Sequence, residues 1–227
     1  MKTKKTIIIF SIISIILFSS CTPAFKTLLS VKDPKVETDY SIQNYLKRIN
    51  SPIRNNFVFD GKPDSLQIYQ NIMKSFYNEP QIFKNNEKYC YQGKSNCPSV
   101  KISSIKNFNS FYSTCIDDTL HMTDLLSRLR PISKSEEIEN TEDLIYIYVY
   151  WSIFHKKRKH KKEYFNLLYN LCLDESVNCE VVLINVDLNS KWGLIPEKKM
   201  RMRFKMKKSK SIDLEFGKIP YIIDSTK

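Results

Sequence analysis

Residues 144–151 read LIYIYVYW, and a continuous apolar run of this kind is what a strand covered on both faces of a sheet requires. A second run, EVVLINVD, occupies residues 180–187. Between the two runs, apolar residues at helical spacing predict a helix over residues 161–173. A buried strand, a helix and another buried strand predict a β-α-β unit with parallel strands and a right-handed crossover. The fold class predicted from this core is α/β.

The segment after this core predicts two further strands. Residues 200–206 read MRMRFKM, and the alternation of apolar and cationic side chains predicts a half-exposed strand with a basic outer face. Residues 219–224, IPYIID, predict a final strand close to the chain end. We therefore expect one α/β unit over residues 142–227.

A polar and acidic stretch at residues 133–141 separates this unit from a first α/β unit, which we expect at residues 39–131. The apolar spacing and the turn residues of this first unit predict alternating helices and strands. The expected elements are a helix over residues 42–49 capped by Asp39 or Ser41, a strand at 57–59, a helix beginning near Asp64, a hairpin of 81–84 with 89–91, and a helix over 118–130 that Pro131 ends.

The composition excludes several classes of function. The chain has 227 residues, a net charge of +12 and 42% hydrophobic residues, which is enough apolar surface for a packed core. Its four glycines lie too far apart to build a P-loop or a dinucleotide-binding fingerprint. With three histidines and neither an HExxH nor a GxSxG motif, the common zinc-protease and nucleophile-elbow mechanisms are excluded as well.

The first residues have the layout of a secretory signal peptide. Three lysines precede an apolar run at residues 7–18, which is shorter than the roughly 20 residues that span a bilayer. The stretch LFSSC at residues 17–21 resembles the bacterial lipobox, which implies removal of residues 1–20 and attachment of acyl chains such as palmitate to Cys21. The alternative is an ordinary signal peptide with a chance cysteine at its end. Residues 21–38 show little periodicity, and we expect them to be a tether.

These features predict a location and a set of partners. A lipid anchor on Cys21 predicts a membrane-bound protein of the cell envelope that faces the periplasm. Acidic residues directly after the lipidated cysteine resemble the retention or surface-export signals of Gram-negative lipoproteins. None stands directly after Cys21, so we favour the outer membrane over the inner one. The expected partners are the membrane, through the anchor, and an envelope protein. Nucleic acid is not an expected partner outside the cytoplasm.

Segments 40–130 and 143–224 resemble thioredoxin-like folds. The first has the element order of the family's C-terminal half, whereas Trp151, Val186-Asp187 and Ile219-Pro220-Tyr221 resemble its redox half and its cis-proline segment. The resemblance implies a mixed sheet with flanking helices, and two thioredoxin-like units if each segment folds separately. The layout that includes residues 187–193, DLNSKWG, is also similar to uncharacterised envelope lipoproteins of Gram-negative bacteria, which imply no reaction.

The thioredoxin dithiol is missing. Where that family has a Trp followed by a Cys-x-x-Cys motif, this chain reads Trp151-Ser152-Ile153-Phe154-His155, so we expect no catalytic residue there. A basic run follows at residues 156–162, at the start of the expected helix. We interpret this run as a solvated surface, in preference to an anion-facing one.

The other cysteines suggest disulfides. Cys90 with Cys97 and Cys172 with Cys179 share a separation of seven residues, and each pair can close a short loop in an oxidising envelope. Cys115 is then left over, and we interpret it as a small buried hydrophobe in preference to a redox or partner-linking thiol.

We expect no metal and no cofactor. His155 and His160 are five residues apart and would face different sides of a helix. Met200, Met202 and Met206 could offer soft thioether ligands to Cu(I), but the flanking cations would repel the ion, and we interpret these methionines as core residues.

Two classes of function remain. The first is a non-catalytic, membrane-anchored thioredoxin-like binding or structural module, which the missing dithiol favours. The second is a thiol-dependent envelope oxidoreductase or redox regulator that uses the remaining cysteines.

Overall fold

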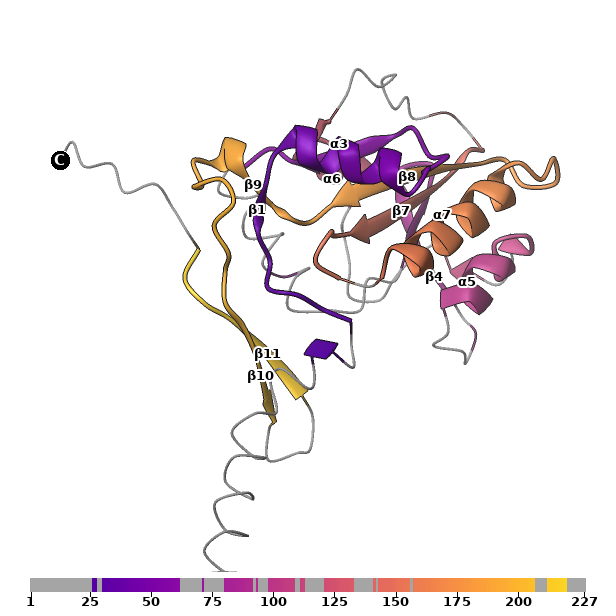
Figure 1. Cartoon of the computed structure of the whole chain (residues 1–227). Coiled ribbons are helices and arrows are strands. Elements are labelled where there is room, and N and C mark those ends of the chain that lie inside the picture. Colours follow the sequence, from indigo (N-terminus) through magenta and orange to yellow (C-terminus); the bar gives the residue numbers. More distant parts are fainter. Residues whose placement is uncertain are drawn as a thin grey trace, which may run out of the picture.

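A computed structural model of the chain describes residues 26–27, 30–61, 71, 80–91, 93, 98–108, 111–112, 121–132, 141, 143–155, 157–206 and 212–219. Figure 1 shows a mixed α/β body with a sheet at its centre and helices against it. The predicted class, α/β, is confirmed.

The central sheet has seven strands in the order β5-β4-β3-β7-β8-β2-β6. In chain order its strands are β2 (Asn56–Phe59), β3 (Gln81–Lys84), β4 (Glu87–Tyr91), β5 (Phe111–Tyr112), β6 (Leu129–Pro131), β7 (Ile145–Trp151) and β8 (Cys179–Asn185). The expected hairpin is present, because β3 and β4 pair antiparallel across a two-residue turn.

The pair β7 and β8 lies at the middle of the sheet. The two strands are parallel over seven residue pairs, from Ile145 opposite Cys179 to Trp151 opposite Asn185. Every residue of β7 is buried. The helix α7 (Arg158–Cys172) connects the two strands, so the β-α-β unit predicted from the two apolar runs is confirmed.

Strands from the two predicted units share this sheet. Strand β3 pairs antiparallel with β7, and β2 pairs parallel with β8, so the pair from the second segment lies between strands of the first. The polar stretch at residues 133–141 therefore divides the sequence without dividing the sheet. We expected two separate α/β units, but strands of both segments form one sheet. The edges of β7 and β8 need neighbouring strands, and β3 and β2 of the first segment supply them.

The alternation of β7 side chains builds a core on each face of the sheet. On one face, Ile145, Ile147, Val149 and Trp151 pack with α7, with α3 (Asp39–Arg48) and with α5 (Pro98–Ser104). On the other, Tyr146, Tyr148 and Tyr150 pack with α6 (Met122–Leu126) and with an N-terminal segment around Val31 and Val36. Figure 1 shows α3, α5 and α7 along one side of the sheet.

Helix α3 forms where its spacing predicts, but its cap is Thr38. The Thr38 side chain accepts a hydrogen bond from the Ser41 backbone N–H, and the Ser41 hydroxyl accepts one from the Thr38 N–H. This reciprocal pair is a capping box, which satisfies two backbone donors at once. The prediction of Asp39 or Ser41 as the cap was therefore wrong.

The helix expected over residues 118–130 is much shorter. Helix α6 ends at Leu126, and residues Leu129–Pro131 form β6, which pairs antiparallel with β2. Pairing at the free edge of β2 outweighs the helical spacing of Leu125 and Leu129. Pro131 fits there because an edge strand tolerates a residue without a backbone donor.

The predicted tether is wrong for residues 31–37. Strand β1 (Val36–Glu37) pairs in parallel with β9 (Leu188–Asn189), and Val31 and Lys35 form single bridges with His155 and Lys199. Val31 and Val36 are buried in the core. These two valines supply the apolar cover that holds the segment on the sheet.

A C-terminal hairpin extends from the body. Strand β10 (Met202–Met206) pairs antiparallel with β11 (Ile212–Phe216) in a separate two-stranded sheet, and Figure 1 shows the two strands pointing away from the central sheet. Met202 is buried and Arg203 is exposed, as the predicted alternation requires. The final strand expected at residues 219–224, with Pro220, and the helix expected from Asp64 lie outside the described residues, apart from isolated positions.

Trp192, in the stretch of residues 187–193, has a structural role. The 3₁₀ helix η2 (Ser190–Trp192) presents the Trp192 indole Nε1, which donates to the Phe59 carbonyl at 2.9 Å. Gly61 has a φ of +83°, and a Cβ there would lie 2.3 Å from Trp192 Cδ1. Only glycine fits both the backbone and the ring at this position.

Asp39, in the first turn of α3, joins three segments. Arg130 binds its carboxylate with two hydrogen bonds at 2.8 and 3.0 Å, Lys191 lies at 2.8 Å, and the Asn189 amide donates at 2.9 Å. Partial burial raises the pKa of Asp39, but these contacts outweigh it and bring the pKa down to about 2. The carboxylate therefore links α3, β6 and η2.

Replacing Asp39 with Asn should lower the free energy of unfolding by about 1–2 kcal/mol at pH 7, because Arg130 and Lys191 lose their counter-ion. The folded-state pKa lies below the ordinary 3.8, so this stability is present above about pH 4 and is lost as the pH falls toward 2. Urea unfolding at pH 7 and pH 3 measures it. Asp124→Asn, at an exposed aspartate, is the control, and an equal effect of both variants would contradict the prediction.

Candidate functional site

The carboxyl ends of β7 and β8 and the start of α7 define the candidate site. In open α/β sheets, ligands bind outside the carboxyl ends of parallel strands. The loop at residues 152–157 connects Trp151 to α7 and carries no cysteine. The place where the thioredoxin resemblance would put a dithiol is thus built from other side chains.

This loop is closed against the N-terminal segment. The Lys32 backbone N–H donates to the Phe154 carbonyl at 2.8 Å, next to the bridge between Val31 and His155. Ser152 is 2% exposed, so its hydroxyl cannot contact a substrate in this conformation. Helix α7 begins only at Arg158, so the expectation that His155 lies on a helix with His160 is wrong.

A buried polar network lies beneath the loop. Asp187 is 1% exposed and its Oδ2 accepts hydrogen bonds from the Ile153 N–H and the Asn185 amide, both at 2.7 Å. The Asn185 side-chain oxygen Oδ1 in turn accepts from the Asp187 backbone N–H at 3.0 Å. Asp187 therefore fixes the turn after β7 to the end of β8.

Lys161 is the only cation of the basic run at residues 156–162 that is buried among those the structure describes, with 5% exposure. Its Nζ lies 3.0 Å from the Tyr45 hydroxyl, 3.4 Å from the Ile153 carbonyl and 4.8 Å from the centre of the Tyr45 ring. Tyr45 stacks on Trp151 at 5.8 Å. For this lysine the prediction of a solvated run was wrong.

The sequence carried a signal for the burial of Lys161. The other buried residues of α7 are Phe165, Leu168 and Leu171, and Lys161 lies one turn before Phe165 on the same stripe. The helical spacing of Lys161 with these apolar residues indicates burial, although its charge and its cationic neighbours indicate exposure. Its neighbours Lys157, Arg158, Lys159, His160 and Lys162 are exposed, as expected.

Asp187 has a strongly perturbed acidity. Burial raises its pKa, the nearby Glu37 adds to the effect, and the net pKa is about 7. The hydrogen bonds from Ile153 and Asn185 and the positive charge of Lys161 act in the opposite direction. Burial therefore makes the Asp187 carboxyl group a weaker acid than an exposed aspartate.

A cleft of about 1150 Å³ opens over this network. It lies between the N-terminal segment, α3 and the start of α7, and its floor includes Val31, Tyr45, Ile153 and Phe154. Seven cationic residues line it: Lys26, Lys32, Lys35, Arg48, Lys157, Arg158 and Lys199. Sequence reasoning identified only Lys157 and Arg158 as part of a basic surface, because the others lie far away in the chain.

The two carboxylates of the cleft are already engaged. Asp33 forms an ion pair with Lys26 at 2.5 Å and accepts the Met202 N–H at 2.8 Å. Glu37 accepts the Ser41 hydroxyl at 2.6 Å. Lys35 is paired as well, with Glu197 outside the cleft lining.

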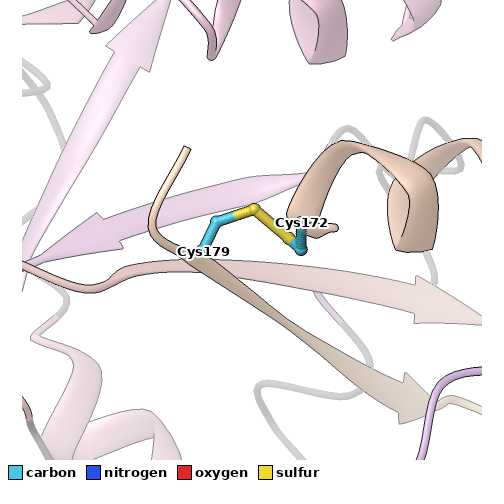
Figure 2. The surroundings of a disulfide bond; sticks show 2 residues. All are labelled: Cys172 and Cys179. Carbon is cyan, nitrogen blue, oxygen red and sulfur yellow. A yellow bond between two sulfur atoms is a disulfide. The ribbon is translucent and has the colours of Figure 1, made fainter. Parts of the chain in front are cut away.

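Three cysteines fall within the described residues, and all are in disulfides. The structure joins Cys172 to Cys179, as their spacing predicts, and Figure 2 shows this bond tying the end of α7 to the start of β8. Cys90 is disulfide-bonded too, to a partner outside the described residues. Cys21, Cys97 and Cys115 lie outside them, so lipidation of Cys21 and the role of Cys115 stay predictions.

No group of three or more potential metal-ligating side chains occurs within the described residues. Met200 and Met202 are 3% and 0% exposed and pack in the core, which agrees with their interpretation as core residues. Within the same ranges, no helix has the length and apolar character needed to cross a bilayer.

Comparisons with known proteins add no identity. No protein-family model matches the chain, and neither a curated protein nor a solved structure matches it. The geometry alone defines the class: a mixed α/β protein with a basic cleft at the carboxyl ends of its central strands.

Replacing Asp187 with Asn should make stability less dependent on pH. The folded-state pKa lies above 3.8, so the contribution of this carboxyl group to folding is complete below about pH 4 and is lost as the pH rises toward 7. Relative to wild type, Asp187→Asn should gain at least ~1 kcal/mol between pH 5 and pH 8 in urea unfolding. Glu175→Gln, at an exposed position, is the control. A constant difference between wild type and Asp187→Asn at both pH values would contradict the prediction.

Proposed function

We propose that this chain is a membrane-anchored cell-envelope lipoprotein that acts as a non-catalytic, thioredoxin-like binding module. Cys21 is the acylated residue, and the folded body faces the periplasm, at the outer membrane in preference to the inner one. The body binds a ligand or an envelope partner and carries out no thiol chemistry.

The observation that carries this proposal is the make-up of the segment after Trp151. A dithiol catalyst needs an accessible thiolate at a helix start and a resolving thiol one turn away. Here the segment has a 2% exposed Ser152, a buried Phe154 and cationic residues at the helix start. The space above it is a basic cleft, which is suited to binding.

The thioredoxin-like part of the proposal draws support from the sheet. The resemblance assigns the family's C-terminal half to residues 40–130 and its redox half to residues 143–224. Strand β3, from the first segment, pairs directly with β7, from the second. Two such halves meeting in one sheet favour a single thioredoxin-like unit, with its halves in exchanged order along the chain, over two units.

The alternative is a thiol-dependent envelope oxidoreductase or redox regulator. It would need a free, reactive thiol, and the described cysteines Cys90, Cys172 and Cys179 are all oxidised. The alternative therefore depends on Cys97 and Cys115, and the predicted pairing of Cys90 with Cys97 would leave Cys115 as the residue that its test must address.

Acylation is tested by Cys21→Ala. We expect this variant to lose metabolic labelling by a fatty-acid analogue, because the thioether and amide sites are removed together, and to leave the membrane fraction or stay uncleaved. Ser20→Ala, one residue earlier, keeps the small side chain before the cut and should label as wild type does. Labelling of Cys21→Ala at the wild-type level would rule out the anchor.

Catalysis is tested by turnover of a disulfide substrate in the presence of a reductant. We expect the mature protein to show no rate above the uncatalysed reaction, since no described thiol is free. Wild type, Ser152→Ala, His155→Ala and Cys115→Ala are compared. Turnover that disappears in Cys115→Ala would establish the oxidoreductase, and turnover that disappears in Ser152→Ala or His155→Ala would reveal an active site after Trp151.

A further inference from the structure

The basic cleft contains more positive charge than the protein itself neutralises. Lys32, Arg48, Lys157, Arg158 and Lys199 line it without an ion-pair partner among the described residues. They come from four separate parts of the chain: the N-terminal segment, the end of α3, the start of α7 and the stretch before β10. Like charges gathered around one concavity repel each other, and a bound anion would remove this repulsion.

The start of α7 adds to the attraction for an anion. Lys157 is the N-cap residue and makes no side-chain capping hydrogen bond, and the first turn contains no acidic residue. The macrodipole of a fifteen-residue helix disfavours cations at this end and favours an anion. Both Lys157 and Arg158 line the cleft, so the helix terminus and the five cations act on the same space.

The floor of the cleft has a different character from its rim. Val31, Tyr45 and Phe154 also line the cleft but are only 4%, 7% and 6% exposed, whereas the five cations are exposed, so the apolar and aromatic side chains lie deeper than the charges. A simple inorganic anion would use only the rim. A ligand with a charged head and an apolar portion would contact both.

The place of the cleft relative to the predicted anchor indicates which ligand of this kind it meets. Lys26 lines the cleft and lies five residues after Cys21, a stretch that spans at most about 17 Å when fully extended. An acylated Cys21 would hold the cleft next to the lipid headgroups. Phospholipids there carry a phosphate on an apolar body.

We propose that this cleft binds the headgroup phosphate of an anionic phospholipid, with Lys32, Arg48, Lys157, Arg158 and Lys199 around the phosphate and the apolar floor against the adjoining part of the lipid. The inference deepens the proposed binding function and rests on it for the nearness of the membrane. The same phosphate chemistry could come from a free phosphate, which the test separates from the lipid.

The test uses the acylated mature protein in a non-ionic, phosphate-free detergent and isothermal titration calorimetry. The probes are dioctanoyl phosphatidylglycerol, inorganic phosphate, and dioctanoylglycerol, which has the same acyl chains without the phosphate. The cleft variant is Lys32→Gln/Lys157→Gln. The matched control is Lys159→Gln/Lys162→Gln, which removes two exposed lysines of α7 that do not line the cleft.

We expect phosphatidylglycerol to bind the wild-type protein and dioctanoylglycerol not to bind. The cleft variant should bind phosphatidylglycerol about tenfold or more weakly, because it loses two charged contacts, while the control stays within about twofold. Equal weakening in both variants, or no binding by wild type, would overturn the proposal. Inorganic phosphate that binds as tightly as the lipid would overturn the lipid assignment.

This result can be separated from a failure of the proposed function. The calorimetry measures ligand binding in the cleft, whereas metabolic labelling measures acylation of Cys21. An acylated protein without phosphatidylglycerol binding would overturn the cleft proposal and leave the anchor intact. A protein that is not acylated but binds phosphatidylglycerol through the cleft would overturn the anchor and leave the cleft proposal intact.

Discussion

The parallel pairing of β7 with β8 over seven residues is the constraint on which the other elements depend. Both strands present apolar side chains to both faces, so the chain must provide two layers of cover and two neighbouring strands. Helices α3, α5 and α7 cover one face, and α6 with the N-terminal segment covers the other. Strands β3 and β2 then close the edges, which is why segments far apart in the sequence form one sheet.

The candidate site is a consequence of how this cover is arranged. The N-terminal segment reaches the loop after β7 through Val31 and Lys32, and α3 brings Tyr45 onto Trp151. These contacts bury Trp151 and Ser152 and leave a basic concavity above them. Buried Lys161 and Asp187 hold this arrangement in place from below. A site of this construction is suited to holding an anion rather than to exchanging disulfides.

The sequence predicted the features that depend on local pattern. The strands around Tyr148 and Leu183, the helix between them and the hairpin at Asn85 follow from periodicity and turn residues, and the structure has them. It did not predict features that depend on distant partners. Leu129 fits a helical pattern but lies in the strand that pairs with β2. Val31 lies in the expected tether but packs in the core against the sheet. The cleft was missed for the same reason, because Lys32, Arg48 and Lys199 become neighbours only through the fold.

The cleft, and therefore the proposed binding function, depends on docking of the N-terminal segment. Amide hydrogen exchange of the mature protein, read residue by residue by NMR, tests it directly. The Lys32 and Val36 amides donate to Phe154 and Lys198, each at 2.8 Å. We predict that they are protected, as amides of a folded unit are, alongside those of β7 and β8. If Lys32 and Val36 exchange at the rate of an unfolded chain while β7 and β8 stay protected, residues 31–37 are a tether and the cleft does not exist.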